Sequence, residues 1–77
     1  MTLRIISAEK VEFEGEVQLV NLPGSKGEFT VLNNHASLLS TLVAGTIRYD
    51  ISGTRSEVSI KGGVVDVDNN VVSVCIY

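Results

Sequence analysis

"VVDVDNNVVSV", residues 64 to 74, is the stretch that decides the fold. Valine alternates with polar residues on both sides of an asparagine pair, and a period of two places successive side chains on opposite faces of a β-strand. Asn69 and Asn70 tolerate the left-handed backbone conformations that a two-residue hairpin turn requires. The stretch therefore predicts a β-hairpin with one apolar face.

The same alternation extends to other parts of the chain. Residues 46–51 and 57–61 alternate apolar with polar side chains, and Ser52-Gly53 supplies a turn between them. Positions of the same phase share one face of a sheet, so we expect one set to be mostly buried. That set comprises Ile47, Tyr49, Val58, Ile60, Val65, Val67, Val72 and Val74.

No segment predicts a helix well. The best candidate is "HASLLSTLVAG", residues 35–45, in which Leu38 and Leu42 are four residues apart and Gly45 provides a stop. Its serine, threonine and valine residues lower the helix propensity, so we predict a strand. About eight short strands without helices indicate an all-β fold, a two-sheet antiparallel β-sandwich or flattened barrel.

The composition fits a single domain, residues 1–77, and excludes several classes of protein. A net charge of −3 with only six lysines and arginines argues against binding to nucleic acid. Cys75 is the only cysteine, so no internal disulfide forms, and we expect a small buried side chain in a protein of a reducing compartment. No apolar run reaches the roughly 18 residues of a membrane span, which indicates a soluble or peripheral protein.

"LPGSKGEFTVLNNHASLL", residues 22 to 39, concentrates turn-forming residues around one short strand. Leu22 to Ser25 predict a type II turn, with Gly24 at the position of positive φ, and Gly27 lets the chain enter a strand with Phe29 and Val31 pointing inward. A phosphate-binding loop is disfavoured because the Lys-Ser/Thr ending and a following helix are missing.

His35 is the only histidine, and it follows two turn-forming asparagines. Catalysis with a single histidine and a single cysteine would require a Ser-His-Asp arrangement, for which the sequence has no nucleophile motif. A zinc site would need more histidine or cysteine ligands. We expect His35 to lie on an exposed turn without a catalytic partner.

Three glutamates, Glu12, Glu14 and Glu16, lie on one side of a strand that places Phe13 inward. Their mutual repulsion is typical of a solvated edge strand, which discourages pairing with other sheets. A calcium site is the alternative, but the chain lacks the ligand spacing of a calcium loop. We predict no metal and no cofactor.

Four fragments in this order resemble one family over nearly the whole chain: "SAEKVEFEGEV" (7–17), "GSKGEF" (24–29), "NHASLLSTLVAGTIR" (34–48) and "KGGVVDVDNNVVSV" (61–74). They are similar to the N-terminal β-sandwich domain of the epsilon subunit of F-type ATP synthases, called delta in mitochondria. The opening fragment resembles the family pattern S-x-E-x-x-x-(Y/F)-x-G-x-V.

The resemblance implies a non-catalytic rotor subunit that joins the gamma subunit to the c-ring and couples proton translocation to ATP synthesis. It would lie at the cytoplasmic face of the bacterial plasma membrane, peripheral and not inserted. By the same resemblance, two sets of residues are implied at interfaces. Ser25, Lys26 and Glu28 would face the polar loops of the c-ring, and Ser7, His35 and Ser40 would face the gamma subunit.

The chain departs from the family at Thr30, Asn33 and Ser37, where glycine, proline and proline are common. The family also commonly continues into a two-helix C-terminal region with inhibitory and, in some members, ATP-binding behaviour. The printed sequence stops at Tyr77, so we expect no C-terminal helical hairpin, no such inhibition and no ATP binding. The alternative function is a stand-alone β-sandwich ligand- or protein-binding module, for which a chain with two Tyr, two Phe and no Trp supplies few aromatic side chains. An enzyme ranks third.

Overall fold

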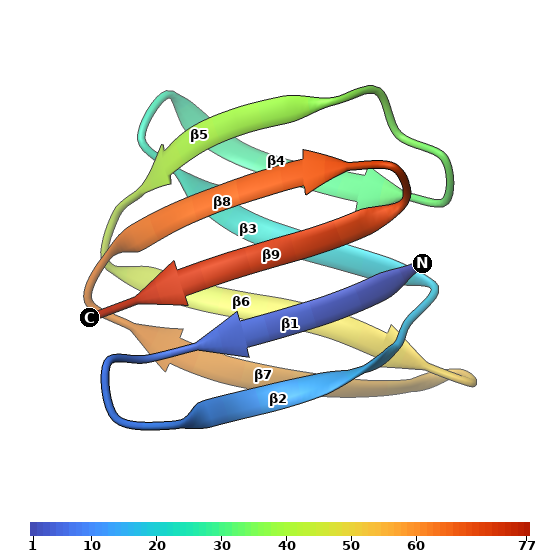
Figure 1. The fold of residues 1–77 in the computed structure, drawn as a ribbon, viewed down its shortest axis with the longest axis horizontal. Helices are drawn as coiled ribbons and strands as arrows, with labels where there is room; N and C mark the ends of the chain where they lie inside the picture. Colours follow the sequence, from blue (N-terminus) through green and yellow to red (C-terminus); the bar gives the residue numbers. More distant parts are fainter.

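The computed structural model describes residues 1–77, and nine β-strands account for most of them (Figure 1). The strands are β1 (Thr2–Ile6), β2 (Val11–Glu16), β3 (Leu19–Gly24), β4 (Gly27–Leu32), β5 (Leu38–Leu42), β6 (Gly45–Ile51), β7 (Thr54–Ile60), β8 (Gly63–Asp68) and β9 (Val71–Ile76). The segment weighed as a helix contains β5, so the prediction of a strand there is confirmed. No helix of the length and apolarity needed to cross a membrane is present.

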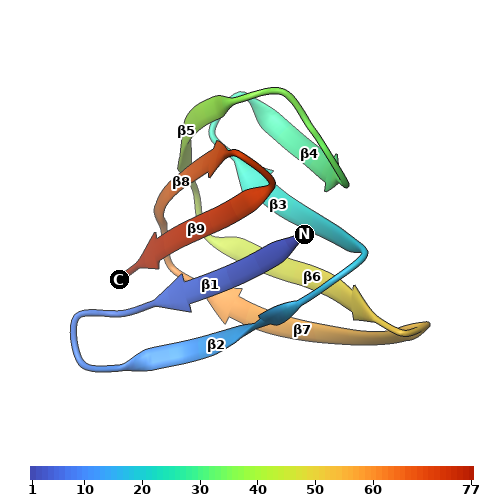
Figure 2. The same ribbon diagram turned by 45° about the vertical axis from the view of Figure 1, so that its right-hand side comes forward.

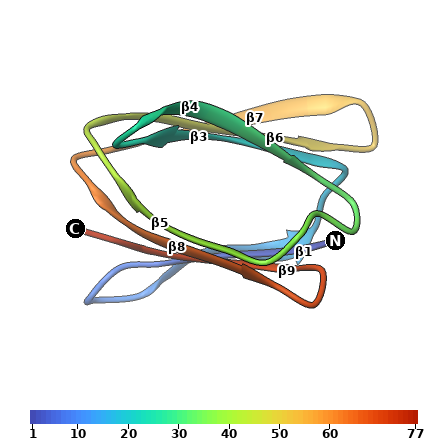
Figure 3. The ribbon, with the colours of Figure 1, turned by 90° about the horizontal axis from the view of Figure 1, so that it is seen from above.

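The strands form two layers that face each other, as the view from above shows (Figure 3). One layer contains β3, β4, β6 and β7, and the other contains β2, β1, β9, β8 and β5. Strand pairing continues from one layer to the other only at a corner, where Gly24 of β3 pairs with Leu42 of β5. The all-β sandwich, or flattened barrel, that the sequence predicts is confirmed.

One pairing differs from the antiparallel prediction. Strand β1 pairs with β9 in parallel, from Thr2 opposite Val71 to Ile6 opposite Cys75. The turned view shows the two strands running in the same direction, side by side (Figure 2). Parallel strands need a long connection between them, and here the connection is most of the chain.

The core lies between the two layers and contains no charged side chain, and Tyr49 is its only residue with a hydroxyl group. Of the eight positions predicted to be buried, all but Val58 are buried, and Val58 is half-buried and packs against the core. Phe13, as predicted, points inward, and its ring lies 4.4 Å from that of Tyr49, centroid to centroid. The fifteen buried side chains belong to Met1, Leu3, Ile5, Val17, Val20, Leu22, Val31, Leu42, Ile47, Tyr49, Ile60, Val65, Val67, Val72 and Val74.

Two of the predicted turns form where expected. Asn69 and Asn70 have φ values of 51° and 62°, so the β8–β9 hairpin has the two left-handed residues that the sequence predicted. Ser52 and Gly53, with φ values of 49° and 84°, make a similar turn between β6 and β7. Both hairpins therefore follow from local sequence alone.

The type II turn predicted for Leu22 to Ser25 is wrong, because the turn lies two residues later. Pro23 and Gly24 belong to β3 and pair with Glu28 and Gly27, so Ser25 and Lys26 make the turn. Gly27, at φ 125°, supplies the positive φ. Gly24 is needed for space, because a Cβ there would approach the Gly27 carbonyl oxygen to 2.7 Å.

The expectation that Cys75 is buried is also wrong, since its thiol side chain is exposed. Strand β9 directs Val72 and Val74 into the core, and the period of two places Cys75 on the outer face. The position of Cys75 in the inward–outward alternation of β9 decides its exposure, and its apolar character does not.

Candidate functional site

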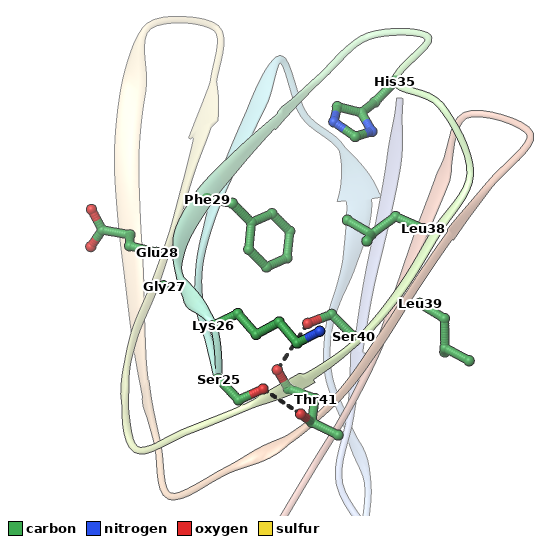
Figure 4. Close-up of a pocket in the computed structure, with 10 residues that line it drawn as sticks. All are labelled: Ser25, Lys26, Gly27, Glu28, Phe29, His35, Leu38, Leu39, Ser40 and Thr41. Carbon is green, nitrogen blue, oxygen red and sulfur yellow. Dashed lines mark hydrogen bonds between the residues drawn. The ribbon is translucent and has the colours of Figure 1, made fainter.

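An open cavity of about 600 Å³ lies between β4 and β5 (Figure 4). It exists because β4 pairs only with β3, and β5 meets β3 only at the corner, so the two strands do not pair with each other. Phe29 and Leu38 fill part of the gap with half-buried side chains. The residues around it are Ser25, Lys26, Gly27, Glu28, Phe29, His35, Leu38, Leu39, Ser40 and Thr41.

The structure brings five of the six predicted interface residues to this cavity: Ser25, Lys26, Glu28, His35 and Ser40. The resemblance had divided them between two interfaces, and the fold places both groups along the same seam. In Figure 4 the side chain of Lys26 extends toward Ser40, whereas the carboxylate of Glu28 points away from the cavity. Glu28 therefore presents its charge on the outer face of the β3 layer.

Hydrogen bonds tie the β3–β4 turn to β5. The Ser25 backbone N–H donates to the Thr41 carbonyl oxygen at 3.0 Å, and the hydroxyl groups of the same two residues are hydrogen-bonded to each other. The Ser40 hydroxyl donates to the Thr41 carbonyl oxygen at 3.0 Å. The exposed polar side chains at this end of the sandwich therefore lie on a backbone that hydrogen bonds to β5 hold in place.

His35 lies on the exposed connection between β4 and β5, at the end of the sandwich opposite to the β3–β4 turn (Figure 4). Its Nδ1 is 2.7 Å from the Ala36 carbonyl oxygen, and no hydrogen bond joins the ring to a serine hydroxyl or a carboxylate. Its backbone N–H donates to the Leu32 carbonyl oxygen at 3.2 Å. These contacts fix the local backbone and give the ring no partner for proton transfer. No group of three or more His, Cys, Asp or Glu side chains is placed to hold a metal ion.

Ser7, the sixth predicted residue, lies apart from the cavity in the connection between β1 and β2. Its Oγ accepts hydrogen bonds from the backbone N–H groups of Glu9 and Lys10, both at 3.3 Å. Its backbone N–H donates to the Lys10 carbonyl oxygen at 2.9 Å. In this structure Ser7 therefore organises a turn.

A row of apolar side chains crosses the outer face of the β1 layer, and the sequence analysis missed it. Register pairs Val64 with Cys75, Cys75 with Ile6, and Ile6 with Val11, across β8, β9, β1 and β2. Val64 and Val11 are 42% and 50% exposed, and Leu39, one row further along β5, is 73% exposed. We call Val11, Ile6, Cys75, Val64 and Leu39 the outer apolar row.

Acidic side chains follow this row toward the opposite end of the same face. Asp66 and Glu14 lie one row on, and Asp68 and Glu16 lie one row further, all exposed. Arg4 is the only cation among them, with its Nε 3.4 Å from the Glu14 carboxylate. The face is thus mainly apolar at one end and mainly acidic at the other, with Leu39 beside Asp66. The glutamates of β2 lie on an edge strand, as the sequence predicted.

The outer face of the β3 layer is different, because its charges are paired across strands. Arg48 donates from Nε to Glu57 at 2.9 Å, and Arg55 donates from Nε to Asp50 at the same distance. This hydrogen bond from Arg55 lowers the pKa of the Asp50 carboxyl below its ordinary value. We call these four residues the paired-charge face.

Comparison with known proteins decides the family. The family model for the ATP synthase delta/epsilon chain β-sandwich domain matches residues 1–76. The chain belongs to this family. It is 40% identical over 73 residues to the ATP synthase epsilon chain of Desulfitobacterium hafniense, covering 95% of this chain and 55% of that one. It is 36% identical over 76 residues to the epsilon chain of Synechocystis, covering 99% and 56%. The chain thus spans somewhat more than half the length of these epsilon-chain relatives.

Solved ATP synthase structures have the same fold. A chain of the Tetrahymena thermophila mitochondrial ATP synthase central stalk and c-ring superposes with a TM-score of 0.81 at 14% identity, over 97% of this chain and 61% of that one. A chain of the Euglena gracilis mitochondrial ATP synthase superposes with a TM-score of 0.90 at 22% identity, over 96% and 48%. The delta/epsilon β-sandwich is therefore the fold of this chain.

Proposed function

We propose that this chain serves as a non-catalytic subunit of the F-type ATP synthase rotor, joining the gamma subunit to the c-ring so that proton translocation is coupled to ATP synthesis. The observation that carries the proposal is its membership of the delta/epsilon β-sandwich family over residues 1–76. The structure adds support, because one close-packed body presents two surfaces of different chemistry. A packed interior resists deformation, which suits a part that transmits torque.

The c-ring contact is assigned to Ser25, Lys26 and Glu28, at the β3–β4 turn. Both charged side chains are exposed, and the turn is hydrogen-bonded to β5 through Thr41. The fixed backbone of this turn presents two opposite charges on different sides of β4, which suits recognition of the polar loops of a ring. The contact would be polar and weakened by salt.

The gamma contact is assigned to the outer apolar row together with Ser7, His35 and Ser40. Ser7 directly follows Ile6 of the row, whereas Ser40 and His35 line the cavity between β4 and β5. Exposed apolar side chains gathered on one sheet face are typical of a protein interface. The acidic residues beyond the row favour a partner surface that is basic on the corresponding side.

Such a rotor subunit would be peripheral to the membrane, on the cytoplasmic face of a bacterial plasma membrane. No metal or cofactor is assigned to it. The alternative, a stand-alone ligand-binding module, would use the 600 Å³ cavity between β4 and β5. That cavity is lined by more polar than hydrophobic residues, and drug-sized ligands prefer mostly apolar sites.

Reconstitution tests the proposal directly. An ATP synthase lacking its epsilon subunit would be assembled with this chain, and ATP-driven proton pumping would be measured in vesicles. We expect the chain to co-purify with gamma and c subunits and to increase pumping per ATP hydrolysed. A chain that is folded but is recovered without either subunit, with pumping unchanged, would overturn the proposal.

A further inference from the structure

Arg48 lies at the centre of three charged side chains on the outer face of the β3 layer. Its Nε donates to Glu57 on β7 at 2.9 Å, and its Nη1 lies 4.0 Å from the Glu28 carboxylate at the start of β4. Arg48 itself belongs to β6, so the contact with Glu28 reaches across β3. Glu57 thus fixes the guanidinium, and the guanidinium faces Glu28.

Glu28 and Arg48 line a second, shallow cavity of about 350 Å³ together with Leu19, Asn21, Thr30 and Arg55. Asn21 of β3 lies at the floor of this cavity, opposite both Arg48 and Thr30 in the register. Its amide donates a hydrogen bond to Thr30 Oγ1 at 3.0 Å. The next β3 residue on this face is Pro23, which pairs with Glu28. No long side chain separates the guanidinium from the carboxylate.

Arg48 is the only cation with an ion-pair contact to Glu28. Lys26 is two residues away, but its side chain extends into the cavity on the other side of β4, as Figure 4 shows. The carboxylate of Glu28 points away from that cavity. The phase of β4 directs Glu28 to the outer face, where Arg48 of β6, and no group of its own turn, lies within ion-pair distance of its carboxylate.

We infer that Arg48 is a positioning residue for Glu28: held by Glu57, it keeps the carboxylate on the outer face, where a basic or polar group of the c-ring loops meets it. The inference rests on the proposed function, because it assigns the ring contact to Glu28. An exposed glutamate has several rotatable bonds, and ordering it before binding reduces the entropy lost on binding. Arg48 contributes through this ordering and does not itself contact the ring.

Charge-balanced variants test this role. Arg48→Gln combined with Glu57→Gln removes the positioning pair without changing the net charge, and Arg55→Gln combined with Asp50→Asn removes the neighbouring pair of the same layer as a matched control. Each variant would be assembled with gamma, and its affinity for purified c-ring would be measured by surface plasmon resonance. Melting temperatures would be recorded in parallel.

We expect the Arg48/Glu57 variant to bind about threefold to tenfold more weakly, the cost of ordering one flexible side chain, and the control to bind normally. In a Glu28→Gln background, removing Arg48 and Glu57 should cause no further loss, because the two changes act on one contact. A purely structural role would lower the affinity equally in both backgrounds, together with the melting temperature.

Two results separate failure of the inference from failure of the proposed contact. Normal affinity of the Arg48/Glu57 variant, with weakened binding of Glu28→Gln, would overturn the positioning role alone. Normal affinity of Glu28→Gln would overturn the ring contact through Glu28, and the positioning role with it. An equal loss in the Arg55/Asp50 control would also contradict the inference.

Discussion

The two outer faces of the sandwich are built from the same alternating strands and differ in how their side chains are satisfied. On the β3 layer, charges are matched across strands, Arg48 with Glu57 and Arg55 with Asp50. On the β1 layer, Val64 and Val11 lie in an exposed apolar row bordered by acids. The paired-charge face leaves few groups without partners, and the apolar row leaves several. The residues that point inward are constrained by packing of the core, whereas those that point outward are not. The difference between the two outer faces therefore indicates where a partner binds.

The largest expected effect is a loss of stability from substitutions in the core. The two layers share this core, so both should respond alike. Ile5 of β1 and Ile47 of β6 are both fully buried. Replacing either with alanine should lower the free energy of unfolding by about 2–5 kcal/mol, because each change removes buried apolar atoms and leaves a cavity. Urea unfolding monitored by circular dichroism measures the loss.

Valine variants at the same two positions, with an expected cost of about 0.5–1.5 kcal/mol, provide the comparison if an alanine variant does not fold. A large loss from one layer and none from the other would show that the layers do not share one core.

Val64→Asp tests whether the outer apolar row, and not the paired-charge face, binds the gamma subunit. A charge within the outer apolar row should weaken gamma binding by about 30-fold or more, in the range of interface hot spots. The free energy of unfolding should change by about 0.5 kcal/mol or less, because the side chain is 42% exposed. Isothermal titration with the gamma subunit measures the affinity.

Ser59→Asp is the matched control for Val64→Asp, since Ser59 is an exposed residue of β7 in the other layer. We expect it to bind gamma normally. Equal weakening by both variants would place the gamma contact elsewhere, or on both faces.

A smaller effect concerns the two hairpins, one in each layer. Both have left-handed residues at their two turn positions, but the β8–β9 turn uses asparagines where the β6–β7 turn has Ser52 at φ 49°. Asparagine tolerates this conformation better than serine, so Ser52→Asn should stabilise the protein by about 0.5 kcal/mol. Thermal unfolding should show a higher midpoint. A lower midpoint would mean that Ser52 contributes contacts that its turn geometry does not require.

The smallest effect is the pH dependence of the paired-charge face. The hydrogen bond from Arg55 lowers the pKa of Asp50 in the folded state. The unfolded chain therefore binds more protons in this range. The stabilisation is complete above the unfolded pKa and is lost as pH falls through the folded one.

Carbon NMR of the Asp50 carboxyl group should show its titration midpoint move upward in Arg55→Gln. Arg4→Gln, on the other layer, should leave that midpoint unchanged. A midpoint that is insensitive to Arg55 would contradict the assigned cause.

Much of the fold follows from the sequence because alternation and left-handed turn residues are local signals. They predict the strands, the inward phase and the β8–β9 turn at Asn69-Asn70. The β3–β4 turn was misplaced because Pro23-Gly24 resembles a local turn, whereas pairing of Leu22 with Phe29 fixes the register and moves the turn to Ser25-Lys26. The parallel β1–β9 pairing was missed for a related reason, since no local signal specifies which distant strand lies alongside.

The candidate site was predictable only in part. The family resemblance implied Ser25, Lys26 and Glu28 at an interface, but the cavity that they share with His35 arises from strands that do not pair. The outer apolar row was hidden because Cys75 was expected to be buried. Only the register shows that Val64, Cys75 and Ile6 lie side by side on the outer face. Surface composition depends on which strands are neighbours, and that information is not local.

The parallel pairing of β1 with β9 also dictates when the domain can form. Strand β1 cannot acquire this neighbour until residues 71–76 have left the ribosome, so the first strand synthesised must wait for the last. Until then β1 has only the β2 hairpin to protect one of its edges, and Leu3 and Ile5 stay accessible to water and to chaperones. Contacts of such long sequence separation slow folding, because loop closure precedes their stabilising effect. The sandwich therefore closes only once β9 has been synthesised, when β1 gains its second neighbour.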